Sequence, residues 1–373
     1  MLIYSSELNH NHNEVSVKAG IIGLPQCGKT TVFNAMTNMK VTVDGYGGKG
    51  VESHVAAVKV PDERMDYLAS VYNPKKLTYV DMTFVDIGCK KKANERSEFD
   101  MASIRGLDML AVVIRAFRDE AVPHPLDRIN PLGDVEQLQS EFLLEDLALI
   151  ETRLERLEKD IKRNNKDAVK ERDYLFEFQK HLEDEKPLRT YPLDSEGEKV
   201  FRGFQFLTLK PVLYIFNTGE TPDKTVDLQS AKAYLENAGI PYIILSGNLE
   251  MEIAQLPEED RALFLEDLKI DEPALSKFIK MSFSLLNRCV FFTVGPDEVR
   301  AWEITSTCTA REAAGKIHSD IARGFIRAEV LSYSDYRACG DSYQSARSKG
   351  LVRLEGKEYV VKDGDMIEFR FNV

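Results

Sequence analysis

The sequence lacks the features that would mark it as a membrane, secreted or metal-cluster protein. No run approaches the ~18 apolar residues of a membrane-spanning helix, and the N-terminus has no basic stretch followed by an apolar one, so we expect no secretory signal. The five cysteines are scattered, odd in number and without a CxxC pair, which argues against a zinc site or a disulfide framework. No internal repeat or low-complexity tract occurs. These absences predict a reduced, cytoplasmic protein with no membrane partner.

Positive charge is also scarce relative to negative charge. The chain has 49 Lys and Arg against 61 Asp and Glu, a net charge of −12. Because phosphate contacts need clustered Lys and Arg, this balance argues against attraction of nucleic acid to the whole surface, and we expect no DNA partner. A local basic patch that meets RNA is compatible with it.

Short apolar segments alternate with helical patterns over much of the chain, which predicts an α/β domain with a largely parallel sheet. Helices are expected at Thr30–Met39 and Leu228–Ala238. The expected strands are Val17–Ile22, Val55–Val60, Thr78–Ile87, Met109–Ile114, Val212–Phe216 and Tyr242–Leu245.

A helical segment interrupts this alternation from Val135 to about Glu185. Apolar residues spaced 3, 4, 3 and 4 apart predict a coiled-coil seam: Leu147, Ile150, Leu154, Leu157 and Ile161. A polar turn at 163–167 and a second helical stretch complete an antiparallel hairpin inserted in the α/β domain.

The last part of the chain predicts a small mixed sheet with one helix, which resembles a β-grasp domain. Strands are expected at Cys289–Val294, Val299–Ile304, near Ala328–Tyr333 and at Tyr359–Phe371, with a helix at Ala310–His318. The predicted boundaries are 15–134 with 207–286 for the nucleotide domain, 135–206 for the helical insertion and 287–373 for the β-grasp unit.

The segment Gly23-Leu24-Pro25-Gln26-Cys27-Gly28-Lys29-Thr30 satisfies the Walker A pattern completely. Its glycines let backbone N–H groups curl around phosphates, and the following helix directs its positive end toward them. Lys29 is expected to reach the β- and γ-phosphates, and Thr30 to place its hydroxyl on Mg²⁺. The pattern predicts that the chain binds a nucleoside triphosphate.

Three further strand ends supply candidate partners of this loop, at Asp86, at Asn217 and at Ser246-Gly247-Asn248. The last would back the base pocket with main-chain groups, and a merely structural turn is the alternative at Asn217 and at Ser246. Asp86 ends a hydrophobic strand, as an aspartate that holds Mg²⁺ does, whereas an ordinary strand-end aspartate is the alternative. Asn217-Thr218-Gly219-Glu220 has the place of a guanine-reading N-K-x-D motif without its Lys and Asp, so guanine preference is not expected. The predicted nucleotide-binding residues are Gly23, Gln26, Cys27, Gly28, Lys29, Thr30, Thr31, Asn217, Thr218, Glu220, Ser246 and Gly247, and the predicted metal ligands are Thr30 and Asp86.

With these motifs, the chain resembles the YchF/Obg-like ATPase family over nearly its whole length. The most specific blocks are Asn217-x-x-Glu220, Glu298-Val299-Arg300-Ala301-Trp302 and Phe369-Arg370-Phe371-Asn372-Val373. The resemblance implies a GTPase-type domain, a helical insertion and a C-terminal TGS domain. It also implies ATP binding in preference to GTP, slow hydrolysis, and a ribosome or RNA partner reached through the TGS and helical domains. Arg300, Arg323 and Arg327 are candidate contacts to RNA phosphates.

Both switch segments depart from the family pattern. Gly50 stands where the family has a threonine that helps to coordinate Mg²⁺, and Cys89 replaces the glycine of Asp-x-x-Gly. Lys90-Lys91-Lys92 follows, either as a solvated loop, as a partner contact, or as charge directed at the transferring phosphoryl group. The catalytic residue is therefore unknown.

Three functions remain open at this point. The first is a regulatory ATPase or GTPase of the translation machinery, and the second is a nucleotide-sensing module that does not hydrolyse. The third, a small-molecule kinase, has no substrate motif to support it. Cys27 allows two interpretations: it is a small residue of the loop where the family has valine or similar, or a helix N-terminus lowers its thiol pKa and makes the nucleotide site redox-sensitive.

Overall fold

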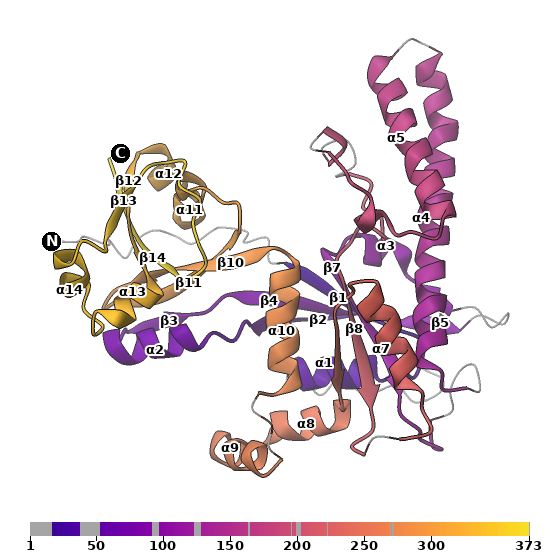
Figure 1. Cartoon of the computed structure of the whole chain (residues 1–373), viewed down its shortest axis with the longest axis horizontal. Helices are drawn as coiled ribbons and strands as arrows, with labels where there is room; N and C mark the ends of the chain where they lie inside the picture. The colour runs from indigo at the N-terminus through magenta and orange to yellow at the C-terminus, as the bar shows by residue number, and fades with distance from the viewer. Residues whose placement is uncertain are drawn as a thin grey trace.

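The computed structural model describes residues 17–37, 53–91, 97–122, 128–162, 165–194, 196–198, 203–221, 223–268, 270 and 272–372. A central α/β unit carries a long helical hairpin on one side and a second sheet, formed mainly by the C-terminal residues, on another (Figure 1). Gly50 and Lys92 lie outside the described residues, as do the side chains of Cys89, Lys90 and Lys91.

The central sheet has the strand order β2-β4-β1-β7-β8-β9. All neighbours are parallel except β2 and β4, so the predicted mostly parallel sheet is confirmed. Every residue of β7 is buried, which explains why this strand reads as a continuous apolar run. The strands are β1 (Lys18–Ile22), β2 (His54–Lys59), β4 (Asp81–Asp86), β7 (Met109–Ala116), β8 (Val212–Thr218) and β9 (Tyr242–Leu245).

Helices cover both faces of this sheet. Buried residues of α1 (Lys29–Thr37) and α10 (Ala274–Leu285) pack on one face. On the other face lie α3 (Met101–Arg105), α7 (Leu228–Asn237) and the first turns of α4 (Pro131–Ile161). Because the carboxyl ends of parallel strands meet at one edge, the loops after β1, β4, β8 and β9 gather there, and this edge is where such sheets bind ligands.

The helical hairpin consists of α4 and α5 (Lys166–Glu183), as the heptad spacing predicts, although α4 already begins at Pro131. Asn130 caps α4 by accepting a hydrogen bond from the N–H of Gly133, and proline fits the first helical position. Ile150 and Leu157 are buried in one cluster with Leu175 and Phe178 of α5. The predicted seam therefore holds the two helices together.

The second sheet has the order β13-β12-β14-β10-β11-β3. Its strands are β3 (Lys76–Thr78), β10 (Arg288–Val294), β11 (Glu298–Thr305), β12 (Phe325–Ser332), β13 (Arg353–Glu355) and β14 (Asp365–Phe371). The expected helix is α11 (Ala310–Ile317), which a capping box between Thr309 and Glu312 starts. The sequence patterns missed β13, α13 (Tyr333–Ala338) and α14 (Tyr343–Ser348) because they are short and carry no clear period.

The prediction of one strand over Thr78–Ile87 is wrong. Residues 76–78 form β3, which pairs in parallel with β11 of the second sheet, whereas β4 begins at Asp81 and pairs with β1 and β2. The chain leaves one sheet and enters the other within two residues, Tyr79 and Val80. An alternating pattern predicts a strand but does not name its partner, so this change of sheet leaves no mark in the sequence.

The segment before β3 also belongs to both units. Helix α2 (Glu63–Tyr72) directs Arg64 to Asp363 at 2.7 Å and Tyr67 to Asp341 at 2.5 Å. One hydrophobic cluster runs from the central sheet through Met65 and Leu68 to Phe292 of β10. The C-terminal sheet is therefore packed firmly against the nucleotide unit.

The three arginines offered as RNA contacts differ in exposure. Arg300 is only 9% exposed, and its guanidinium lies 3.9 Å from the centre of the Trp302 ring. It therefore packs within the sheet, and the expectation that Arg300 contacts RNA phosphate is wrong. Arg323 and Arg327 are exposed, and Arg323 pairs with Asp320 at 2.7 Å. Within the described ranges no helix is long and apolar enough to cross a membrane.

Replacement of Arg64 by alanine is expected to lower the free energy of unfolding by about 1–3 kcal/mol. Arg64 is partly buried, bonds both Asp62 and Asp363, and lies over the Phe292 ring. The matched control is Lys75→Ala, whose ion pair with Asp297 is exposed and should contribute little to the free energy of unfolding. Urea denaturation followed by the fluorescence of Trp302, the single tryptophan, measures both. Equal losses in the two variants would contradict the role given to Arg64.

Candidate nucleotide site

The phosphate loop joins β1 to α1 in a conformation that few side chains tolerate. Gln26 and Gly28 have φ angles of 63° and 89°, in the left-handed region. A Cβ on Gly23 would lie 2.4 Å from the carbonyl oxygen of Val113, and one on Gly28 would lie 2.1 Å from Asn217 Nδ2. Backbone curvature of this kind turns successive N–H groups to one side, where an anion fits. The helix that begins at Lys29 adds its positive end to the same place.

Thr30 and Asp86 meet at the edge of this loop. Thr30 Oγ1 donates a hydrogen bond of 2.9 Å to Asp86 Oδ2, although the two residues lie on different elements. Asp86 is 3% exposed, and its other oxygen, Oδ1, has no hydrogen-bond partner among the described residues. Burial raises the pKa of Asp86, against the opposing influence of Lys29, Thr30 and His54. A buried carboxylate oxygen without a donor, next to a hydroxyl, suits a divalent cation that takes oxygen ligands.

Asn217 joins the loops at the other side. Its Nδ2 donates to the carbonyl oxygen of Cys27 at 3.0 Å, and its Oδ1 accepts from the N–H of Gly247 at 2.9 Å. Ser246 caps α8 (Gly247–Gln255) by accepting from Leu249 N, and Thr218 donates to the carbonyl of Leu245. The amide of Asn217 therefore organises the site with its own hydrogen bonds.

Of the other predicted residues, Thr31 lies with the cluster and Glu220 does not. A Cβ on Gly247 would lie 3.3 Å from Thr31 Cγ2, so Thr31 belongs to the cluster. Glu220 is exposed and, within the described residues, makes no hydrogen bond or ion pair with the phosphate loop. A pocket of about 520 Å³ lies beside Thr218, lined also by Ala116 and residues 223–229. Its size falls in the range of small-molecule sites.

Sequence reasoning missed Arg115 of β7, whose guanidinium donates hydrogen bonds to the phosphate loop and to the loop after β7. It is 2% exposed, donates to the carbonyl oxygens of Gln26 at 3.4 Å and Val122 at 2.7 Å, and lies 4.4 Å from the centre of the Phe117 ring. The sequence feature that could have revealed Arg115 is an arginine inside an apolar strand. A charged residue is rarely buried without partners, so such an arginine indicates hydrogen bonds to nearby loops. His54 was missed as well. It opens β2 directly opposite Asp86, and the atoms Nδ1 and Oδ2 lie 3.9 Å apart.

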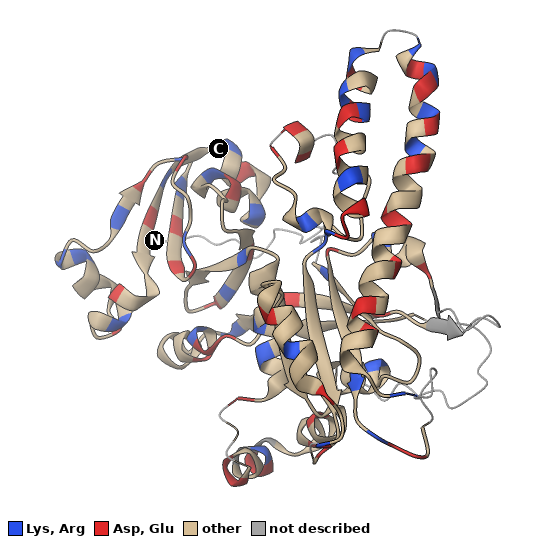
Figure 2. Ribbon diagram, turned by 45° about the vertical axis from the view of Figure 1, so that its right-hand side comes forward, with Lys and Arg blue, Asp and Glu red and all other residues tan. Residues whose placement is uncertain are grey.

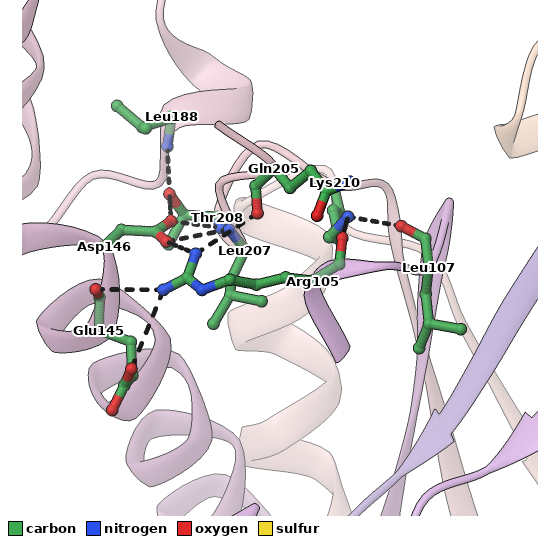
Figure 3. Close-up of polar contacts among 9 residues, drawn as sticks. All are labelled: Arg105, Leu107, Glu145, Asp146, Leu188, Gln205, Leu207, Thr208 and Lys210. Atoms are coloured by element: carbon green, nitrogen blue, oxygen red, sulfur yellow. Dashed lines mark hydrogen bonds and ion pairs between the residues drawn. The ribbon is translucent and has the colours of Figure 1, made fainter. Parts of the chain in front are cut away.

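The segment after Asp86 forms a small hairpin. Strands β5 (Cys89–Lys91) and β6 (Ser97–Phe99) pair antiparallel, and α3 follows immediately. At the end of α3, Arg105 Nη1 donates to Asp146 Oδ1 of α4 at 2.9 Å (Figure 3). Asp146 is fully buried and also accepts from the N–H groups of Leu207 and Thr208 and from the hydroxyl of Thr208.

This cluster, the Asp146 node, therefore joins three segments: α3, which follows the β5–β6 hairpin; α4, which with α5 forms the helical arm; and the chain that returns from this arm at Leu207 and Thr208. Lys210 adds to it by donating to the carbonyl of Arg105 at 2.9 Å.

The geometry defines a P-loop nucleoside-triphosphate-binding protein with a GTPase-like central sheet. Comparisons with known families and structures agree with this class. A model named YchF-GTPase_C, described as a protein of unknown function, matches residues 289–372. A model described as ferrous iron transport protein B matches residues 17–69, which contain the phosphate loop.

Three relatives bear the name ribosome-binding ATPase YchF. That of Bacillus subtilis (strain 168) is 39% identical over 96% of this chain and 100% of its own length. The Mycoplasma genitalium protein is 37% identical over 96% and 100% of the two chains, and that of Escherichia coli O157:H7 is 36% identical over 95% and 99%. The solved structure of the Schizosaccharomyces pombe YchF GTPase is similar with a TM-score of 0.81 and 26% identity, covering 95% of this chain and 98% of that one. The chain belongs to the YchF family.

Of the two interpretations of Cys27, the one with a lowered thiol pKa is contradicted. Cys27 is 2% exposed, and burial raises its pKa to about 11, although Lys29 acts in the opposite direction. The helix N-terminus does not compensate for the loss of water around the thiolate.

Hydrogen peroxide is therefore expected to affect nucleotide binding equally in wild type and Cys27→Val. At pH 8 a thiol with a pKa of about 11 is roughly 0.1% ionised, and the thiolate is the reactive form. Calorimetric titration with ATP before and after peroxide treatment tests this. Loss of binding in wild type alone would show that Cys27 is reactive after all.

Proposed function

We propose that the chain is a regulatory P-loop ATPase that binds ATP in preference to GTP, hydrolyses it slowly and acts on the ribosome. The observation that carries the proposal is the 2.9 Å contact between Thr30 and Asp86 beside the lysine of the phosphate loop. Three groups that triphosphate hydrolysis requires thereby stand together: an anion-binding loop, a lysine and a cation site. Nucleotide turnover needs little more from the protein than such positioning and charge.

Base preference follows from the chemistry of the Asn217–Glu220 segment. Guanine recognition uses an aspartate that accepts two hydrogen bonds, and this chain has the longer Glu220, which is exposed. Without the short carboxylate, guanine loses the hydrogen bonds that distinguish it, whereas adenine loses none. Asn217 cannot substitute for it, because its amide is engaged by Cys27 and Gly247.

A magnesium ion fits the residues present. Thr30 Oγ1 and Asp86 would hold it, the carboxylate directly or through water, and the ion would neutralise charge on the β- and γ-phosphates. Lys29 would bind the same phosphates from the loop, and the backbone N–H groups of the loop would orient them.

The Asp146 node supports a route from nucleotide to partner. The switch hairpin β5–β6 leads into α3, and Arg105 connects α3 to α4. A movement of the hairpin when the γ-phosphate is present would therefore shift the helical arm. Coupling through a chain of buried polar contacts needs an element with two arrangements, and the hairpin after Asp86 is the candidate.

The ribosome is the partner that the names of the relatives give for those proteins. For this chain, a ribosomal partner would place it in the cytoplasm. The helical arm carries both signs of charge along its length (Figure 2), so it is not a basic stripe of the kind that binds RNA by charge alone. We therefore assign the arm to protein or mixed contacts, and the exposed Arg327 to RNA phosphate.

A sensing module that binds nucleotide without hydrolysis is the second candidate. It is favoured by the β5–β6 pairing, in which Cys89 is fixed as a strand residue opposite Phe99. A hydrogen-bonded strand is less free to turn its N–H toward a γ-phosphate than a glycine loop is.

Lys29→Ala is expected to weaken ATP binding in the presence of Mg²⁺ by roughly 10- to 100-fold, because one charge-assisted contact to phosphate is lost. The matched control is Lys18→Ala on β1, whose side chain is exposed. Calorimetry with ATP and GTP, with phosphate release followed on the same sample, measures affinity, base preference and turnover.

ATP binding with slow turnover, absent in Lys29→Ala, supports the ATPase. Binding without turnover moves the assignment to the sensing module. If the wild type binds neither nucleotide, both the ATPase and the sensing module are ruled out. If it binds GTP more tightly than ATP, only the proposed base preference is overturned.

Arg105→Met is expected to leave ATP binding within about twofold and to abolish the difference in ribosome binding with and without ATP. Asp146 keeps its three other donors, so the node remains hydrogen-bonded while its link to α3 is cut. Arg153→Met is the control, since Arg153 pairs with Glu171 at 2.6 Å inside the helical arm and does not touch α3. Co-sedimentation with ribosomes gives the readout, and an ATP effect preserved in Arg105→Met would contradict this route.

A further inference from the structure

His54 occupies the cation end of the nucleotide site. It is the first residue of β2 and stands directly opposite Asp86 in the antiparallel pair β2–β4, so the two side chains share one face of the sheet. Its Nδ1 lies 3.9 Å from Asp86 Oδ2, the oxygen that accepts the Thr30 hydroxyl. The Phe33 ring of α1, with its centre 6.3 Å from that of the imidazole, packs beside it.

Two atoms of this group are buried without a hydrogen-bond partner among the described residues. They are Nδ1 of His54 and Oδ1 of Asp86. A buried polar atom left without a partner destabilises the fold, and most such atoms in native proteins are satisfied. Two of them on facing residues, one a nitrogen lone-pair site and one a carboxylate oxygen, point to a cation that both would bind.

The 3.9 Å between His54 Nδ1 and the Oδ2 atom of the Asp86 carboxylate suits one shared ion. Two atoms that each bind a divalent ion at about 2.0–2.2 Å lie roughly 3–4 Å apart. In the described part of the chain no three His, Cys, Asp or Glu side chains come together as a complete metal site. Thr30, Asp86 and His54 therefore make a partial site, whose remaining positions would be filled by phosphate oxygens and water.

We propose that His54 supplies a nitrogen ligand to the cation that accompanies the nucleotide, and that this ligand raises the affinity of the site for transition ions such as Mn²⁺ or Co²⁺, while the oxygen ligands still accept Mg²⁺. The inference rests on the proposed function, since the phosphates complete the site. Its physical reason is ligand chemistry: Mg²⁺ is held by oxygen and dehydrates reluctantly, whereas imidazole suits later divalent ions.

Pulsed electron paramagnetic resonance of the full chain with Mn²⁺ and ATP tests the proposal without relying on turnover. With histidine labelled with ¹⁵N, a directly bound imidazole gives a nitrogen coupling on the manganese signal. The variants are His54→Asn and, as control, His181→Asn, a histidine on α5 whose Nε2 contacts Thr190. Affinities for ATP with Mg²⁺, Mn²⁺ and Co²⁺ are measured on the same proteins by calorimetry.

The expected result is a ¹⁵N coupling in wild type and His181→Asn that disappears in His54→Asn. The ratio of Mn²⁺- to Mg²⁺-supported affinity should fall about tenfold in His54→Asn only. ATP binding with Mn²⁺ but no nitrogen coupling in wild type overturns the proposal and leaves the nucleotide function intact. That test holds even if His54→Asn does not fold, and absence of ATP binding with any ion removes the nucleotide function itself.

Discussion

The site depends on one side-chain amide. Asn217 at the end of β8 binds the phosphate loop through the carbonyl of Cys27 and the turn after β9 through the N–H of Gly247. Three loops that come from distant parts of the sequence are thereby held at fixed separations before any ligand arrives. Because binding to a preformed site saves the cost of ordering loops, this arrangement favours affinity. The buried Arg115 does the same for the loop from the side of β7.

Two structural routes lead away from the cation end of the site. One runs along β4 into β3 and α2, and so into the C-terminal sheet. The other runs through β5–β6 and α3 to the Asp146 node and the helical arm. Asp86 lies where the two diverge, at the end of β4 and before the hairpin. If the proposed function holds, a change at the phosphates would reach both outer parts of the molecule through these contacts.

What the sequence predicted well is what local pattern determines. The phosphate loop, the heptad seam with Ile150 and Leu157, and the positions of Asp86 and Asn217 at strand ends all follow from spacing within one segment. What it missed depends on which segments become neighbours. His54 and Arg115 matter because of residues across the sheet, and the thiol pKa of Cys27 is raised because other residues bury it. Strand β3 leaves its expected sheet for a partner more than two hundred positions away.

The position of β3 also bears on the order in which the protein can be assembled. Its sheet takes one edge strand from residues 76–78 and the other five from residues 288–371. A ribosome synthesises the edge strand long before its neighbours, so β3 must wait unpaired while α4, α5 and the central sheet are made. Strand β11, the partner of β3, is synthesised more than two hundred residues later. Completion of the second sheet at β3 therefore depends on β11, which is synthesised much later.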